Sequence, residues 1–142
     1  MAKPHNEYVL NKVKTASPLE LVVIAYDGAI GHLEKAKAEM TEKKYHLAGE
    51  RIIKAQKLLR ELRNALNMEV EEISGNLFAA YHVLDRQLSK AGKEKDTAII
   101  DEVIKKLVEL RETWQEIAKK IPLSEQQQLK KDKDFKFLNK YQ

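Results

Sequence analysis

Histidine and carboxylate side chains are the residues of this 142-residue sequence that could hold a metal ion or transfer a proton. Di-iron helical bundles use Glu-x-x-His pairs and zinc proteases use His-Glu-x-x-His, because these spacings put two ligands on one face of a helix. Neither pattern occurs here, since the four histidines are far apart, at His5, His32, His46 and His82. We therefore expect the histidines to be surface or boundary residues, and we predict no metal site and no bound cofactor.

The remaining candidates for catalysis are Asp27 and Ser17, and neither has the partners that a reaction needs. Asp27 has no histidine or second acid beside it, so a hydrogen bond at the helix surface or between helices is the simpler role. Ser17 lacks the Gly-x-Ser-x-Gly context of an activated nucleophile, and its position suits a helix cap. The glycines form no phosphate-binding loop. The sequence predicts a protein that is not an enzyme and has no catalytic residues.

Cysteine usage and hydropathy narrow the location of the protein. The absence of cysteine excludes disulfides and suits a reducing compartment. The N-terminal residues carry charges where a secretory signal needs an apolar core. The longest uncharged apolar run, Leu21 to Tyr26, is far shorter than the roughly 20 residues of a membrane span. We expect a cytoplasmic protein without membrane insertion.

The net charge of +4 lies at the C-terminal end of the chain. From Lys119 onward there are seven lysines and three acidic residues, which leaves 19 basic and 19 acidic residues in positions 1–118. A nucleic-acid-binding domain is expected to carry its basic surface or its recognition motif within the folded part. The neutral body therefore argues against nucleic acid as a partner.

Apolar residues recur at spacings of three and four in four successive segments, which is the period of an amphipathic α-helix. The predicted inward positions of the four segments are Leu19, Val22, Val23, Tyr26, Ile30, Leu33 and Met40; Tyr45, Ala48, Ile52, Ala55, Leu59, Leu62 and Leu66; Ile73, Leu77, Ala80, Tyr81, Leu84, Leu88 and Ala91; and Ile100, Val103, Leu107, Leu110, Trp114, Ile117 and Ile121. Tyr26 and Trp114 fall on this inward register, so we expect both in the core. Short turns favour antiparallel neighbours. We predict an all-α fold, an antiparallel up-down four-helix bundle over residues 17–121, with an N-terminal arm at 1–16 and a charged C-terminal tail at 122–142.

Helix-start and helix-stop signals bound these segments. Ser17, Pro18 and Glu20 form a capping box with proline at the first helical position. Gly92 can take a left-handed conformation and is predicted to end the third helix. Asp96 is predicted to cap the fourth helix.

The first helix is more apolar than one inward stripe requires. Leu21, Ile24, Ala25 and Gly28 form a second apolar face, opposite much of the inward stripe. In one reading this face is covered by the N-terminal segment or by a second copy of the protein. In the other it is the floor of a groove, in which the small Ala25 and Gly28 let a partner's helix or backbone come close. The residues alone leave both readings open.

The N-terminal residues resemble the signature of a known family. Tyr8 and Val13 are followed by Thr15-Ala16-Ser17-Pro18 and, eight positions after the proline, by Tyr26-Asp27-Gly28. This pattern is similar to that of the flagellar secretion chaperones, the FliS family. Supporting residues follow in the family's order: Lys54, Ala55, Glu61, Leu62, Leu66, Asn67, Asn76, Leu77, Tyr81, Arg86, Leu88, Asp96, Glu102, Leu107, Leu110, Arg111 and Trp114. The sequence departs from the family where it has Val-Glu-Glu-Ile-Ser-Gly before the third helix and Gln87 in place of a second arginine.

The resemblance implies a cytosolic, non-enzymatic export chaperone. It implies that the protein binds the C-terminal segment of newly made flagellin, prevents premature polymerisation and aids delivery to the flagellar type III export apparatus. On this reading Tyr8 and Val13 belong to an arm that packs on the bundle and shifts or leaves when flagellin docks. The residues that we predict to bind flagellin are Leu21, Ile24, Ala25, Gly28, Ile53 and Leu58.

The last residues, 122–142, lie beyond the resemblance, and their lysine- and glutamine-rich composition is typical of a flexible segment. Their aromatic and leucine side chains nevertheless give the tail apolar anchors with which it can dock on its own bundle or on a partner. Two alternative functions stay open. One is a nucleic-acid-binding module that uses the basic tail. The other is a self-associating helical scaffold, a homodimer that buries the second apolar face of the first helix.

Overall fold

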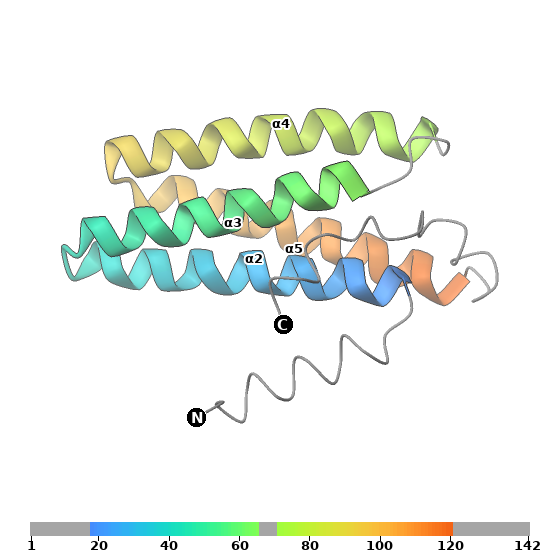
Figure 1. The fold of residues 1–142 in the computed structure, drawn as a ribbon, viewed down its shortest axis with the longest axis horizontal. Coiled ribbons are helices and arrows are strands. Elements are labelled where there is room, and N and C mark those ends of the chain that lie inside the picture. Colours follow the sequence, from blue (N-terminus) through green and yellow to red (C-terminus); the bar gives the residue numbers. More distant parts are fainter. Residues whose placement is uncertain (1–17, 66–70, 121–142) are drawn as a thin grey trace, which may run out of the picture.

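A computed structural model describes residues 18–65 and 71–120 of the chain. The predicted arm with Tyr8 and Val13, the cap at Ser17 and the tail lie outside these residues. Within them the chain forms α-helices and no strand (Figure 1). The helices are α2 (Pro18–Thr41), α3 (Tyr45–Ala65), α4 (Glu71–Glu94) and α5 (Thr97–Lys120).

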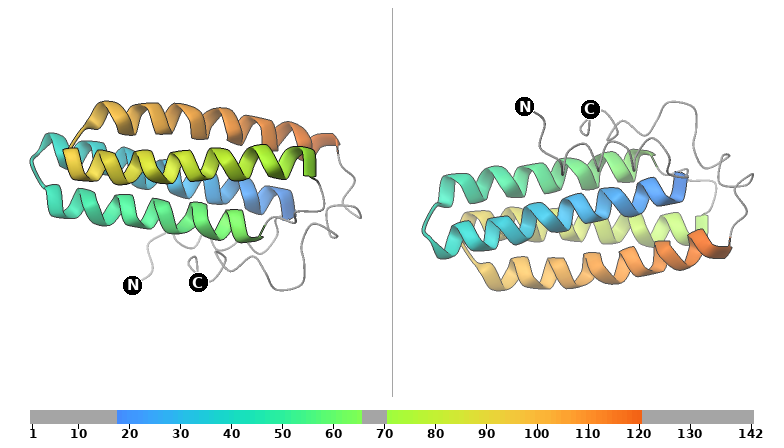
Figure 2. Two further views of the ribbon diagram at one scale, coloured as in Figure 1. Left: turned by 90° about the horizontal axis from the view of Figure 1, so that it is seen from above. Right: turned by 90° about the horizontal axis from the view of Figure 1, so that it is seen from below.

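The four helices lie side by side and run alternately up and down (Figures 1 and 2). α2 packs between α3 and α5, and α4 completes the bundle by packing on α3 and α5, diagonally across from α2 (Figure 2). The predicted all-α antiparallel bundle is confirmed. None of the helices described is long and apolar enough to cross a membrane.

The seam that α2 turns toward the core differs in part from the predicted one. It consists of Leu19, Val22, Tyr26, Ala29, Leu33, Ala36 and Met40, all buried. The prediction that Val23 and Ile30 lie on the seam is wrong, because they are only half-buried and pack at the edge of the core. Ala29 and Ala36 hold the inward positions instead, since strict alternation of three and four residues from Val22 leads to them and not to their bulkier neighbours.

The predictions for the other helices are met in part: Ala80 and Leu110 are only half-buried. The side chains of five further predicted inward residues lie outside the described part of the chain: Leu66, Ile73, Leu77, Ile117 and Ile121. The buried apolar residues of α3, α4 and α5 are Ala48, Ile52, Ala55, Leu58, Leu59 and Leu62; Tyr81, Leu84, Leu88 and Ala91; and Ile100, Val103, Ile104, Leu107 and Trp114. Tyr45, predicted to point inward, is instead 37% exposed at the start of α3. The Lys95 ammonium lies 4.5 Å from the centre of its ring. This contact stacks a cation on an aromatic face at the end of the bundle.

One polar side chain, Gln56, is buried within the described part of the bundle. Its Nε2 donates to the Asp85 carbonyl at 3.1 Å and to Ser89 Oγ at 2.9 Å, both on α4. Because its amide hydrogens are bonded to these acceptors, burial does not leave the donor unsatisfied. Gln56 therefore links α3 to α4 at a fixed position along both helices.

The turn between α4 and α5 corrects one predicted helix end and confirms one cap. α4 continues through Gly92 to Glu94, and Lys95 takes the left-handed conformation with φ 56°. The Asp96 N–H donates to the Ala91 carbonyl at 3.1 Å, which is the bond that closes such a helix end. The prediction that Gly92 ends the helix is therefore wrong. Asp96 Oδ1 accepts from the Ala98 N–H at 2.9 Å, so the predicted cap of α5 is confirmed.

Candidate functional site

The inner face of α2 carries a hydrogen-bonded aromatic cluster in the core. The Tyr26 and Tyr81 hydroxyl groups hydrogen-bond to each other, and Trp114 Nε1 donates to the Tyr26 hydroxyl at 3.2 Å. Burial raises the pKa of Tyr26 to about 12, and burial also raises the pKa of Tyr81 well above its usual range. Both phenols are therefore protonated at neutral pH. The cluster ties α2, α4 and α5 together, and the predicted core positions of Tyr26 and Trp114 are confirmed.

Asp27 connects α2 to α5. Its Oδ1 accepts from Arg111 Nη1 at 2.7 Å, so the expected hydrogen bond between helices is confirmed. An ion pair between Lys37 and Asp101 joins the same two helices farther along. Both pairs are partly exposed to solvent, where such interactions typically contribute about 0–1 kcal/mol each. They belong to the surface of the bundle and offer no reactive geometry.

The histidines that the structure describes lie at the surface or the boundary, as predicted. His46 is exposed beside Glu50 at 3.1 Å, His82 is exposed, and His32 is half-buried. No three side chains that could ligate a metal gather anywhere in residues 18–65 and 71–120. His5 lies outside these residues.

The second apolar face that the sequence predicted on α2 is the first part of the candidate site. Leu21, Ile24, Ala25 and Gly28, which we call the outer face of α2, lie to the side of the seam or opposite it. Ile24 is two residues from Val22, a rotation of about 200° at about 100° per residue, so it lies off the inward seam, although it belongs to the same cluster of buried apolar residues. Its side chain is nevertheless only 6% exposed; Leu21 and Ala25 are also buried, and Gly28 is half-buried. The outer face is thus covered and not open to solvent.

The two flanking residues predicted on α3 lie on different sides of that helix. Leu58 is buried and shares its flank with Arg51, two turns earlier, whose Nε donates to Glu39 of α2 at 3.1 Å. Leu58 therefore faces α2. Ile53 is rotated from Leu58 by about 140° and is 51% exposed. Leu58 thus lies on the flank of α3 that faces α2, whereas Ile53 lies on an exposed side of α3.

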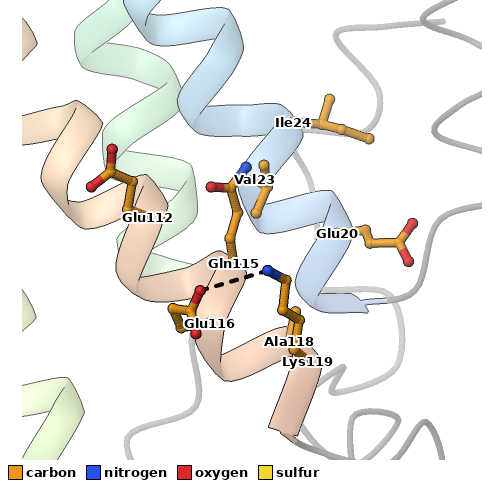
Figure 3. Close-up of a pocket in the computed structure, with 8 residues that line it drawn as sticks. All are labelled: Glu20, Val23, Ile24, Glu112, Gln115, Glu116, Ala118 and Lys119. Atoms are coloured by element: carbon orange, nitrogen blue, oxygen red, sulfur yellow. Dashed lines mark ion pairs between the residues drawn. The ribbon is translucent and has the colours of Figure 1, made fainter.

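A groove between the start of α2 and the end of α5 adjoins the outer face (Figure 3). Its volume is about 680 Å³, and its lining residues are Glu20, Val23, Ile24, Glu112, Gln115, Glu116, Ala118 and Lys119. Figure 3 shows Ile24 at the margin, pointing away from α5, while Val23 and Gln115 lie between the two helices. Lys119 pairs with Glu116 at 3.6 Å, so the groove keeps a surplus of carboxylates. We call it the acidic groove.

Sequence analysis missed the acidic groove, because α2 and α5 contribute to it from opposite ends of the bundle sequence. The only local signal is the spacing of Glu112 and Glu116, which puts two carboxylates on one face of α5. That spacing is common on solvated helices and predicts no site by itself. Packing against Val23 and Ile24 turns the same carboxylates into one wall of a groove.

The candidate site is therefore a helix face with a groove beside it, on an antiparallel four-helix bundle, and not a pocket with reactive side chains. Residues 1–121 match the family described as flagellar protein FliS, and the chain belongs to that family. The resemblance seen in the sequence is thus confirmed.

Three relatives illustrate the extent of the match. The flagellar secretion chaperone FliS of Bacillus subtilis is 30% identical over 113 residues, which cover 80% of this chain and 84% of the relative. Its namesake in Vibrio cholerae is 32% identical over 108 residues, covering 75% and 79%. The flagellar secretion chaperone FliS of Salmonella typhimurium is 30% identical over 119 residues, covering 82% and 88%. The match therefore spans most of each chain.

Proposed function

We propose that this protein is a cytoplasmic, non-enzymatic export chaperone that binds the C-terminal segment of flagellin. By holding that segment it prevents premature polymerisation, and it aids delivery of flagellin to the flagellar type III export apparatus. The observation that carries the proposal is the outer face of α2, where Leu21, Ile24 and Ala25 give the helix a second buried apolar surface beside its inward seam. Membership of the FliS family and the names of its relatives support a role in flagellar secretion.

The chemistry of the outer face suits an amphipathic segment. Leu21 and Ile24 offer apolar area, whose removal from water stabilises a complex by about 25 cal/mol per Å². Ala25 and Gly28 are small, so the backbone of a bound segment can approach α2 closely. A segment that is unfolded before it binds spends roughly 2–5 kcal/mol or more of the interaction energy on ordering. This ordering cost lowers the affinity, which favours release of the client at the export apparatus.

Burial of the outer face gives binding the character of an exchange. Because Leu21, Ile24 and Ala25 are already buried, the flagellin segment has to replace the atoms that cover them. The measured affinity then equals the difference in free energy between the contact that flagellin makes and the contact that it replaces. It does not contain the full free energy of burying the face. The predicted movement of an arm that contains Tyr8 and Val13 is one form of this exchange.

The test is a calorimetric titration with a peptide from the C-terminal region of the same organism's flagellin. Leu21→Asp or Ile24→Asp should weaken binding at least 100-fold, because a carboxylate buried without a partner costs several kcal/mol. Val83→Asp is the matched control, since Val83 is 52% exposed on α4, diagonally across the bundle from α2. Circular dichroism shows whether each variant folds. Wild-type affinity in folded Leu21→Asp and Ile24→Asp variants would show that the outer face is not the binding site.

A third variant avoids placing a charge in a buried position. Gly28→Leu adds a bulky side chain to the outer face of α2 while raising helix propensity by roughly 0.8 kcal/mol relative to glycine. We expect it to keep or raise the melting temperature and to weaken peptide binding about tenfold. A self-associating scaffold predicts a different result, a concentration-dependent dimer that Leu21→Asp dissociates and that binds no flagellin peptide.

A further inference from the structure

Basic residues, three of them lysine or arginine, continue the outer face of α2 toward the turn between α2 and α3. His32 lies one helical turn beyond Gly28 on α2, and Lys54 lies one turn from Leu58 on α3. Lys35 and Arg51 stand on the same flanks, one turn farther on. We call His32, Lys35, Arg51 and Lys54 the cationic cluster. It forms the end of the surface on which flagellin is proposed to lie.

The cationic cluster has an unbalanced charge and an unfilled hydrogen bond. Arg51 is paired with Glu39 at 3.1 Å, whereas Lys35 and Lys54 are exposed and pair with no acidic side chain in the described ranges 18–65 and 71–120. Within the same ranges, the Nδ1 atom of His32 is buried and has no hydrogen-bond partner. Burial, followed by the charges of Lys54, Arg51 and Lys35, lowers the pKa of His32. An anionic group at this position would balance the lysines and could accept a hydrogen bond from His32.

The opposite end of the same surface has the opposite charge. Ile24 belongs both to the outer face and to the acidic groove, whose lining contains three glutamates and one lysine, Lys119, which pairs with Glu116. An acidic residue of a bound segment is therefore attracted to one end of the surface and repelled from the other. Charge complementarity of this kind selects register and orientation more than it adds affinity.

We propose that the cationic cluster binds an acidic side chain of the flagellin segment, and that this contact sets the register of the segment on the outer face of α2. The proposal rests on the proposed function. His32 lies seven residues beyond Ala25, about 11 Å along the helix. The acidic residue is therefore expected about three residues from its apolar anchor in an extended segment, at about 3.3 Å per residue. In a helical segment the separation is about seven residues.

The experiment compares charge reversals by titration with the same flagellin peptide. Lys54→Glu and Lys35→Glu should each weaken binding about tenfold at low salt and less at physiological salt, because partly exposed charges are screened. Lys105→Glu is the matched control, since Lys105 is also exposed, lies on α5, and undergoes the same charge change. It should alter the affinity less than twofold. All three lysines are exposed, so these substitutions leave the core intact.

A second arm identifies the acidic residue of the peptide. Each Asp or Glu of the peptide is replaced in turn by Asn or Gln, and each variant is titrated against wild-type protein and against Lys54→Glu. One replacement should weaken binding to the wild type about tenfold and strengthen binding to Lys54→Glu, because in that variant it removes the repulsion between two carboxylates. This coupling would show that the cluster contacts that residue directly.

The outcomes separate the two proposals. Equal affinities for Lys54→Glu, Lys35→Glu and Lys105→Glu would overturn the cationic cluster, while loss of binding in Leu21→Asp would still support the outer face. No peptide binding by the wild-type protein would overturn both. Unchanged peptide binding beside a Lys54-dependent affinity for a mixed-sequence oligonucleotide would assign the cluster to phosphate groups and would also overturn the proposal.

Discussion

The inner and outer faces of α2 are both apolar, but they differ in how their neighbours are specified. On the inner face, the Tyr26 hydroxyl bonds to Tyr81 and to Trp114, so geometry admits one arrangement of α2, α4 and α5. On the outer face, Leu21, Ile24 and Ala25 carry no polar side-chain atoms. Apolar contact is non-directional, whereas buried hydrogen bonds tolerate little displacement. The inner face therefore specifies its neighbours by hydrogen-bond geometry, and the outer face does so by apolar contact alone.

Removing the largest side chain of the inner face should have the largest effect on stability. Trp114→Ala is expected to lower the free energy of unfolding by about 3–5 kcal/mol, because it leaves a cavity and removes the donor to Tyr26. Urea denaturation measures this loss. The folded fraction should bind the flagellin peptide as the wild type does, since Trp114 lies in the core. Equal stability of Trp114→Ala and wild type would contradict the core assignment.

A smaller change tests the hydrogen bonds of the inner face without a large cavity. Tyr26→Phe keeps the ring and deletes one oxygen, so the Trp114 N–H and the Tyr81 hydroxyl lose their partner. We expect unfolding to become easier by about 1–3 kcal/mol. Tyr45→Phe is the matched control, because Tyr45 is partly exposed and should change stability by less than about 0.5 kcal/mol.

Alkaline pH should weaken the inner face specifically. Burial raises the pKa of Tyr26 from 10.0 to about 12, so the folded state holds a proton that the unfolded state releases. The contribution is fully present below pH 10, and it is lost as the pH rises through about 12, at up to about 1.4 kcal/mol per pH unit. Urea denaturation at several pH values above 9 measures the slope. Tyr26→Phe should flatten it, and an identical slope in both proteins would contradict the assignment.

The ion pair at the margin between the two faces should matter least. Asp27→Asn keeps the size of the side chain and removes the charge that Arg111 contacts. Because both groups are partly exposed, we expect a loss of about 1 kcal/mol or less, which decreases with added salt. A loss as large as that of Tyr26→Phe would mean that the Asp27–Arg111 ion pair contributes as much to stability as the buried hydrogen bonds of the core.

The periodicity of apolar residues predicted the four helices, but it did not predict every residue that packs inward or every helix end. Spacings of three and four predicted all four segments because amphipathic period is a local property of the chain. The prediction for the seam of α2 was wrong at Val23 and Ile30. These larger side chains were assigned to the core, but Ala29 and Ala36 hold the inward positions. The predicted end of α4 was wrong because Lys95, and not Gly92, takes the left-handed conformation. The hydrogen bond from the Asp96 N–H to the Ala91 carbonyl stabilises this strained but allowed backbone.

The candidate site was predictable only where it depends on one helix. The surplus of apolar residues on α2 identified the outer face, but it could not show that the face is covered. Ile53 and Leu58 are close in sequence, and only the packing of α3 on α2 separates them. The cationic cluster and the acidic groove each need two helices in register. The sequence around His32 or Glu112 contains no local pattern that predicts which residues of the neighbouring helix lie beside them.

Gln56 gives this arrangement a further consequence. Seams made largely of leucine, isoleucine and alanine can interlock again when one helix slides by a turn along another, so apolar packing alone leaves several alignments of similar energy. If α3 slid along α4, the Gln56 amide would lose its hydrogen bonds to the Asp85 carbonyl and the Ser89 hydroxyl. It would then be buried against apolar side chains without a partner. This single amide therefore fixes the alignment of α3 along α4, which depends on two hydrogen bonds from one side chain.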